Sequence, residues 1–488
     1  MPVSELGATR VDCEGTAGVP SLFLLCLALH LPVSCRGLET DDPAGSAQAK
    51  EQRLGKAFRR DCDGWIFIHL EGDPATVGYQ HGSLLAEEID DSLAMLRCSV
   101  PVTARRDWSF FRDAASSLFW PKLDADARRE IEGIAEGARA RGKAIDSIDI
   151  VAMNGWMEIA WYYIPGLDKL DNKAPGNCSA FIATGSYTKG GGIVMGHNAW
   201  IDYGVGQRWN VVMDLVPDRG RRMFMDSFPG FIHSGDDFAL NDAGILVTET
   251  TITQFKGFDP QGDPEFARAR RAMQYSESID DWVRIMRAGN NGAYANSWLI
   301  GDRKSGEIAR LELGLRNSPL ERTRDGFFIG SNFPADEKLC AEETTFNPGD
   351  SANSPNARRC RWEDLMKQHK GRIDVESGKI FLADHFDTFT QTENPCARTL
   401  CGHVELDPRG APEWEWPPHF PGGASQSKVV DSRLASRLSF WACFGHACGQ
   451  DFHAKPFLVA HPQFAWMKPF LHDLPSGPWS LFEAVHQP

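Results

Sequence analysis

The spacing of hydrophobic residues divides this chain into a mostly helical first part and a strand-rich second part. An apolar run at 65–70 predicts a strand, and the next segments carry apolar or small residues at helical spacing, at 74–95, 124–141 and 148–161. A cluster of helix breakers, Ala174-Pro175-Gly176, ends this pattern. Short apolar runs then predict strands at 178–184, 193–195, 211–216, 222–225, 244–251, 297–301 and 308–313, interrupted by helices at 264–276 and 279–287.

This order of elements predicts an α+β fold in one globular domain over residues 57–488, with an antiparallel sheet core and helices on its faces. Within the domain we expect a helical N-terminal part at 57–177 and a sheet-forming part at 178–488. The composition is that of a folded chain, since 42% of the 488 residues are hydrophobic and 24% are charged.

Residues 1–36 resemble a secretory signal peptide. Their apolar run at 19–34 is too short to span a bilayer but has the length of a signal-peptide core. Residues 37–56 are polar and rich in small side chains, as a linker would be. We therefore expect a secreted or periplasmic protein without a transmembrane span. A lipid anchor at Cys35 is disfavoured because Pro32 stands where lipoprotein cleavage sites usually carry leucine.

The charge and the short motifs exclude several function classes. The net charge is −15, and no basic run could neutralise a phosphate backbone, so we expect no nucleic-acid partner. The sequence also lacks the Gly-x-Ser-x-Gly elbow, the His-Glu-x-x-His helix, the phosphate-binding loop and the dinucleotide fingerprint. A serine-elbow hydrolase, a zinc-helix peptidase and a nucleotide-dependent enzyme all fit the chain poorly.

The cysteines favour a disulfide over a metal site. Three of the twelve lie in the predicted signal peptide, which leaves nine. Cys396 and Cys401 are close enough in sequence to close a small loop, and Cys443 and Cys448 repeat that spacing. Metal ligation is the alternative, but no neighbouring histidine and cysteine set at zinc spacing completes a site. We therefore expect a bridge between Cys396 and Cys401, and no metal or organic cofactor.

Cys178 is the candidate nucleophile, because it opens a predicted strand directly after Pro175-Gly176-Asn177. Glycine permits a bent backbone in which the Asn177 carbonyl approaches the Cys178 sulfur. An N-to-S acyl shift and hydrolysis would then free the amine of Cys178. That amine, with a reference pKa of about 7.7 to 8.0, can act as general base for its own thiol. The alternative is that Cys178 is a buried packing residue.

The predicted hairpin places a second polar pair near Cys178. If the chain turns near residues 187–188, an antiparallel register brings His197 and Asn198 beside the nucleophile. His197 could then orient the thiolate or a carbonyl, and Asn198 could donate to an oxyanion. A simple turn is the alternative for both residues.

Several blocks of sequence in the same order resemble the phospholipase B-like family. They are Asn177-Cys178-Ser179-Ala180, Gly196-His197-Asn198-Ala199-Trp200, Asp226-Ser227-Phe228-Pro229-Gly230, the segments 234–238 and 244–252, and Asn291-Gly292-Ala293-Tyr294-Ala295-Asn296-Ser297-Trp298. The resemblance implies an αββα N-terminal nucleophile hydrolase fold, made as a precursor that cuts itself into two associated chains. It also implies relatedness to acyl-coenzyme A:6-aminopenicillanate acyltransferase-like cysteine amidases.

The resemblance also suggests roles for particular residues. Cys178 matches the family nucleophile and the cleavage point after Asn177, and His197 and Trp200 fall in the block beside the pocket. Asn296 stands where related amide hydrolases place an oxyanion-stabilising asparagine. Asp236, Glu249 and Thr250 fall in matching blocks and are candidates for the substrate pocket. For Asp236 a turn-capping role stays open, and for Glu249 and Thr250 a core-strand role.

The sequence therefore predicts an acyl hydrolase that releases fatty acids from phospholipids through Cys178. Two alternatives stay open. One is an N-acyl amide hydrolase or acyltransferase of the same superfamily. The other is a secreted binding protein that has the fold but no turnover. The expected partner is a small lipid or acyl-amide substrate.

Overall fold

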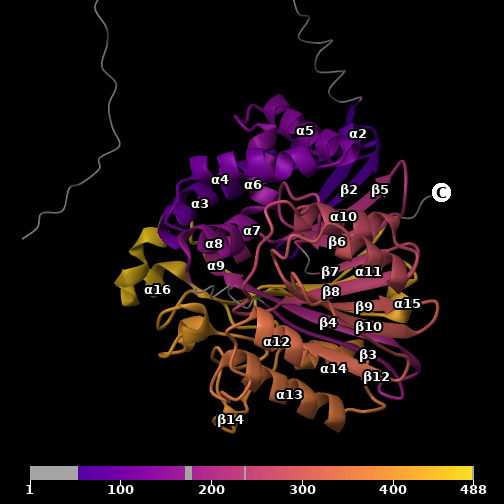
Figure 1. Ribbon diagram of the computed structural model, residues 1–488, viewed down its shortest axis with the longest axis vertical. Coiled ribbons are helices and arrows are strands. Elements are labelled where there is room, and N and C mark those ends of the chain that lie inside the picture. Colours follow the sequence, from indigo (N-terminus) through magenta and orange to yellow (C-terminus); the bar gives the residue numbers. More distant parts are fainter. Residues whose placement is uncertain (1–52, 171–177, 236–237, 486–488) are drawn as a thin grey trace, which may run out of the picture. The chain divides into compact units, whose positions relative to one another are not determined.

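The fold consists of two stacked β-sheets with helices on both outer faces (Figure 1). The computed structural model describes residues 53–170, 178–235 and 238–485. The predicted signal peptide and most of the predicted linker therefore lie outside the described residues, as do Asn177 and Asp236. Among the helices of the described residues, none is long and apolar enough to cross a bilayer.

The first sheet contains strands from both halves of the chain. Its order is β1 (Phe58–Cys62), β2 (Trp65–Gly72), β5 (Val211–Pro217), β6 (Met223–Ser227), β7 (Phe238–Asn241), β8 (Ile245–Thr251), β9 (Asn296–Asp302), β10 (Glu307–Leu313) and β11 (Leu320–Thr323). Neighbours are antiparallel except β2 and β5, which are parallel. The antiparallel core predicted from the sequence thus needs one correction. The parallel pair is possible because a long connection through the N-terminal helices and the β3–β4 hairpin joins its strands.

The second sheet carries the segment that begins at Cys178. Its order is β12 (Gly326–Gly330), β3 (Ser179–Gly185), β4 (Gly191–Asp202), β15 (Gly422–Asp431), β16 (Ser439–Phe444) and β17 (Ser480–Glu483). A separate small ribbon pairs β13 (Phe386–Asp387) with β14 (Thr392–Glu393). Strand β3 contacts β8, β9 and β10 of the first sheet, so one face of β3 is turned toward that sheet.

Helices cover the outer faces of both sheets (Figure 1). On the first sheet, α2 (Pro74–Leu84) contacts β2 and β5, α10 (Glu265–Tyr275) contacts β7, and α11 (Ile279–Arg287) contacts β9 and β10. On the second sheet, α13 (Ser354–Gln368) contacts β12, and α14 (Val375–Leu382) contacts β4 and β15. The predicted αββα arrangement is confirmed.

The remaining helices are short or belong to the N-terminal part. They are α3 (Ala86–Thr103), α4 (Trp108–Ala114), η1 (Ala115–Phe119), η2 (Trp120–Lys122), α5 (Ala125–Ala140), α6 (Ser147–Asn154), α7 (Trp156–Glu158), η3 (Ile159–Tyr163), α8 (Ile164–Asp168), α9 (Tyr203–Gly206), α12 (Glu337–Glu343), η4 (Val404–Leu406), η5 (Pro412–Trp414), α15 (Ser432–Ala435), α16 (Ala454–Ala460) and η6 (Pro462–Met467). The helix predicted at 74–95 is two helices, because α2 ends at the Leu85 cap and α3 begins directly after it.

Glycines explain how closely α2 and α5 pack. A Cβ atom built on Gly78 would lie 2.0 Å from the Glu130 carbonyl oxygen, and one on Gly82 would lie 1.9 Å from that of Ile134. No side chain fits at these separations, so the backbones of the two helices touch. The contact fixes the N-terminal helices against β2 and hence against the first sheet.

The β3–β4 hairpin sets the register on which the candidate site depends. The predicted antiparallel hairpin forms, with Ala180 paired with His197 and Ser179 with Asn198, a register two residues from the one that a turn at 187–188 gives. On its other side β4 pairs with β15, and His197 is opposite Lys428. Two segments about 230 residues apart in sequence thus place charged and polar side chains next to the start of β3.

Buried histidines should make the folded state sensitive to acid. Burial lowers the pKa of His81 from 6.5 to about 3 and that of His233 to about 4. Below pH 6.5 the unfolded chain binds protons that the folded chain cannot, so stability is lost as the pH falls. At pH 5 the loss should be on the order of 2 kcal/mol per histidine.

Urea unfolding at several pH values tests this expectation. In wild type the unfolding free energy should fall steeply between pH 6.5 and 5. The variant His81→Gln, whose amide oxygen can still accept the hydrogen bond from the Gly230 backbone, should show a shallower slope by about one proton. An unchanged slope would contradict the assignment of His81 as a neutral buried group.

Candidate functional site

Cys178, His197 and Glu249 form a buried polar cluster between the two sheets. The Cys178 sulfur lies 3.8 Å from Glu249 Oε1, and one ligand-type atom from each of the three residues lies within 4.8 Å of the others. Cys178 is 1% exposed, and His197 and Glu249 are 0% exposed. The fold therefore brings a thiol, an imidazole and a carboxylate together from the start of β3, from β4 and from β8. These donor types could also hold a metal ion.

Arg358 of α13 fixes the backbone of the nucleophile. Its Nη1 donates to the Cys178 carbonyl oxygen at 2.6 Å and to Ser179 Oγ at 2.9 Å, and its Nη2 donates to Asn332 Oδ1 at 2.8 Å. The guanidinium carbon lies 4.3 Å from the centroid of the Trp200 ring. The start of β3 is thus held by a planar cation whose geometry suits several acceptors at once.

Arg358 keeps its positive charge beside Cys178 although it is buried. Burial lowers the pKa of Arg358 from 12.5 to about 9, although Glu413 and Cys178 act in the opposite direction. A pKa near 9 leaves the guanidinium charged at neutral pH, so a positive charge lies beside the cysteine. Sequence reasoning missed this residue, because an arginine in a charge-rich helix carries no local signal of burial.

His197 is kept neutral by its surroundings. Burial lowers its pKa well below 6.5, and the positive charge of Lys428 lowers it further, whereas a hydrogen bond with the Glu249 backbone opposes both effects. A neutral imidazole can position a neighbouring group, but it cannot serve as an acid near neutral pH.

Lys428 is itself part of a buried ion pair. Its Nζ lies 2.8 Å from Asp226 Oδ2, and both side chains are 0% exposed. Gln426 donates to the same oxygen at 3.0 Å and accepts from Lys428 at 2.5 Å. Burial raises the pKa of Asp226, while Lys428 lowers it. The pair links β6 of the first sheet to β15 of the second, next to His197.

A small cavity adjoins the Cys178 side chain. Its volume is about 10 Å³, and its lining includes Cys178, Trp200, Trp209, Tyr294 and Ser425. This space is about that of one water molecule. The predicted pocket residue Trp200 therefore lies beside the nucleophile, but an acyl chain needs a wider opening than the structure has.

Asn296 on β9 and Thr250 on β8 are buried polar residues that are not part of the cavity lining. Both amide atoms of Asn296 are without a hydrogen-bond partner among the described residues, and the side chain is 0% exposed. Asn296 begins β9 two residues after Tyr294, which lines the cavity. Thr250 follows Glu249 on β8, and its side chain lies against Gly330 of β12.

Asn198 is not brought into the cluster. Its Nδ2 donates to the carbonyl oxygens of Leu382 and Leu400, both at 2.8 Å, and Ser427 Oγ donates to its Oδ1 at 2.5 Å. Successive residues of a strand point to opposite faces, so the side chain next to His197 faces α14 instead. The oxyanion role expected for Asn198 is therefore corrected to a structural one.

The disulfide expected between Cys396 and Cys401 is not formed in the structure. Both are free thiols: the Cys396 sulfur lies 3.8 Å from Asp387 Oδ2, and the Cys401 sulfur lies 3.7 Å from His403 Nε2. Cys443 and Cys448 are free as well. Short sequence spacing did not identify the partners, because the loop directs the two sulfurs to different neighbours.

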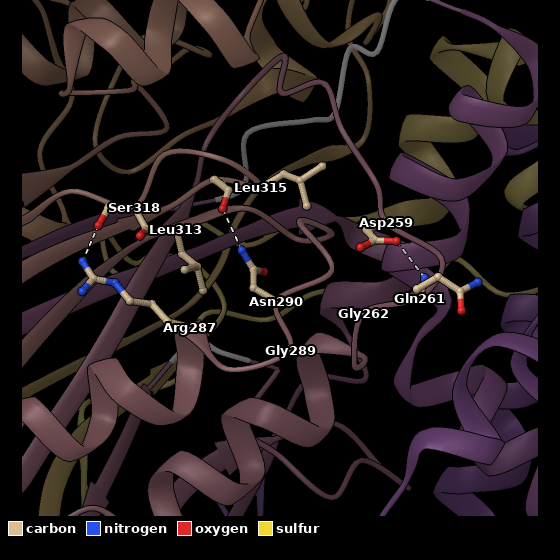
Figure 2. A pocket seen from close by; sticks show the side chains of 10 residues that line it. Asp259, Gln261, Gly262, Arg287, Gly289, Asn290, Leu313, Leu315 and Ser318 are labelled. Atoms are coloured by element: carbon tan, nitrogen blue, oxygen red, sulfur yellow. Dashed lines mark hydrogen bonds between the residues drawn. The ribbon is translucent and has the colours of Figure 1, made fainter.

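A surface depression of about 450 Å³ is lined by none of the cluster residues (Figure 2). Its polar groups are bonded within the surrounding loops: Asn290 Nδ2 donates to the Gly314 carbonyl at 2.7 Å, and Arg287 donates to the Ser318 carbonyl. The described lining of the depression contains neither a histidine nor a cysteine, and its one serine, Ser318, has no histidine beside it in that lining. The smaller cavity at Cys178 is therefore the better candidate for an active site.

Comparisons with known proteins match part of this chain to the phospholipase B family. The phospholipase B family model matches residues 112–313. An uncharacterised protein of Archaeoglobus fulgidus is 27% identical over 281 residues, which are 52% of this chain and 45% of that protein. A Crotalus adamanteus protein named phospholipase B is 24% identical over 337 residues, 62% of this chain and 56% of that protein. The matched part spans about half the length of these two relatives.

Among solved structures, a mutant conjugated bile acid hydrolase from Clostridium perfringens is matched at 10% identity with a TM-score of 0.30. The match covers 54% of this chain and 88% of that chain. The resemblance to the phospholipase B-like family that the sequence predicts is confirmed by the family match.

Proposed function

We propose that this protein, whose residues 112–313 match the phospholipase B family, is an acyl hydrolase with Cys178 as its nucleophile. The observation that carries the proposal is the buried cluster of Cys178, His197 and Glu249, whose ligand-type atoms lie within 4.8 Å of one another. The family match includes all three residues. The substrate that we favour is a phospholipid acyl ester.

The proposed nucleophile becomes active when the bond between Asn177 and Cys178 is cut. The sulfur attacks the Asn177 carbonyl carbon, the carbon–nitrogen bond breaks, and the nitrogen takes up the thiol proton. Water then hydrolyses the thioester, which yields a carboxylate on Asn177 and a free thiol and amine on Cys178. The hydrogen bond from Arg358 to the Cys178 carbonyl supports this step, because it holds the nucleophile in place on the new chain.

The two chains would stay together after the cut because they share one sheet. Strand β2 precedes the cut and pairs with β5, which follows it, over seven residues from Ile66↔Val211 to Gly72↔Pro217. Export of the protein rests on the predicted signal peptide at 1–36.

In turnover, the free amine of Cys178 accepts the thiol proton, and the thiolate attacks the acyl carbonyl carbon. Asn296 is the proposed amide donor to the oxyanion, because it is buried without a hydrogen-bond partner in the described part of the chain. The carboxylate of Glu249 is suited to hold the ammonium form of the amine, since it already lies 3.8 Å from the sulfur. The leaving alcohol takes the proton, and water releases the fatty acid from the acyl-enzyme.

The proposed substrate can be tested directly with matured protein. We expect faster release of fatty acid from phospholipid vesicles than from N-acyl amino acids, with Cys178→Ala inactive on both. Faster amide hydrolysis would instead support the amidase alternative. If the protein hydrolyses neither substrate and does not react with an acyl-directed thiol probe, the result would support a binding protein without turnover.

A further inference from the structure

The loop that supports the Trp200 wall of the cavity has little regular structure. Between α14 and β15 the chain forms only the β13–β14 ribbon and the turns η4 and η5 within its described residues. The Leu400 carbonyl in this loop accepts hydrogen bonds from Asn198 Nδ2 at 2.8 Å and Trp200 Nε1 at 3.3 Å. A loop of about forty residues needs an additional constraint to hold such contacts in one arrangement.

Four side chains meet at one point of this loop. His385, Cys401 and His403 come from the loop, and Cys448 comes from the segment after β16. One ligand atom from each lies within 4.8 Å of the other three. Cys401 and His403 are 0% exposed, whereas His385 and Cys448 are half-buried, so an ion could enter from their side.

We propose that His385, Cys401, His403 and Cys448 bind one zinc ion, which fastens the loop to the end of β16. With zinc–sulfur bonds of about 2.3 Å and zinc–nitrogen bonds of about 2.0–2.1 Å, tetrahedral geometry separates sulfur from nitrogen by about 3.5 Å. His403 Nε2 lies 3.5 Å from the Cys448 sulfur and 3.7 Å from the Cys401 sulfur. Two thiolates and two imidazoles are a donor set that selects zinc.

The surroundings of His403 orient it for this role. Its Nδ1 lies 2.8 Å from Glu405 Oε1, which fixes Nε2 as the ligand atom. Glu405 is held in turn by the hydroxyl of Tyr203, which donates to Oε2 at 2.6 Å. The ring of His446 stacks on that of His403 at 4.1 Å between centroids. A carboxylate behind a ligating imidazole is the usual second layer of a zinc site.

Four protein ligands leave no open position, so the site is structural and takes no part in the chemistry at Cys178. A disulfide between Cys401 and Cys448 is the competing arrangement. It would use the two sulfurs but would not explain why two imidazoles converge on them. Both cysteines are free thiols in the structure.

The test measures metal content and thiol state of the full-length protein after expression with added Zn²⁺. We expect about one zinc per chain by mass spectrometry of the elements, with Cys401 and Cys448 reduced in peptide maps. Cys448→Ser should lose at least nine-tenths of the zinc. Glu405→Gln, which keeps all four ligands, should weaken zinc affinity about 10–100-fold.

Two controls separate this site from other thiols. Cys443→Ser changes a buried cysteine near Cys448 and should keep the zinc, and Cys178→Ala should keep it too. Cys401 is completely buried and its replacement can prevent folding, so His385→Gln, at a half-buried ligand, provides the second ligand variant. A Cys401–Cys448 disulfide in wild type, or full zinc content in Cys448→Ser, would overturn the proposal.

Discussion

Cys178→Ala is expected to remain one uncut polypeptide without acyl hydrolase activity. The variant lacks the sulfur that attacks the Asn177 carbonyl, and without the cut no free amine exists to act as the base. Wild type should yield two fragments on a denaturing gel, the larger one beginning with Cys178 by intact mass. The effect should be a complete loss of both events.

A second cysteine variant tests whether loss of any cysteine would have the same effect. Cys360→Ala alters an exposed cysteine on α13 and should be cut and active like wild type. Thermal unfolding should show that Cys178→Ala is folded. Cleavage of Cys178→Ala before position 178, or a wild-type fragment that begins at another residue, would contradict the assignment of Cys178 as the nucleophile.

Lys428→Met is expected to destabilise the protein by about 3–5 kcal/mol, because it leaves the Asp226 carboxylate buried without its cation. Both side chains are 0% exposed and 2.8 Å apart, so solvent cannot replace the lost partner. The double variant Lys428→Met with Asp226→Leu removes both charges and should recover most of the loss. Urea unfolding of the two single variants and the double variant measures the coupling.

An exposed ion pair provides the scale for this effect. Lys367 and Glu363 lie 3.6 Å apart on α13 with side chains 66% and 37% exposed, so Lys367→Met should cost no more than about 0.5 kcal/mol. A similarly small effect for Lys428→Met would show that the buried pair does not hold the two sheets together. If the double variant does not recover the unfolding free energy, the loss in Lys428→Met arises from altered packing and not from the unpaired charge.

Local pattern in the sequence was enough to predict the hairpin that carries the nucleophile. The change from helical to strand spacing at 174–178 and the turn expected near 187–188 indicated two antiparallel strands, and the structure pairs them with Ala180 opposite His197. The same reasoning failed for Asn198. Only its hydrogen bonds to Leu382 of α14 and to Leu400 show that its side chain points to the outer face of β4.

Long-range contacts could not be predicted in the same way. Arg358 reaches Cys178 from 180 positions away, and its helix resembles any other charge-rich surface helix until it is packed on the second sheet. The four candidate zinc ligands extend from position 385 to position 448 without a zinc spacing, which is why the sequence favoured a short disulfide there.

The sequence by itself determined the alternation of strands and helices, the family resemblance and the position of Cys178 at the start of a strand, because these depend on neighbours along the chain. Only the tertiary structure decided what surrounds that sulfur. Stacking the two sheets brings Glu249 to the cluster, strand β15 brings Lys428 beside His197, and helix α13 brings Arg358 to the Cys178 backbone. Burial then lowers the pKa of His197 and of Arg358. Desolvation and long-range pairing arise only in the folded chain, so no local pattern records them.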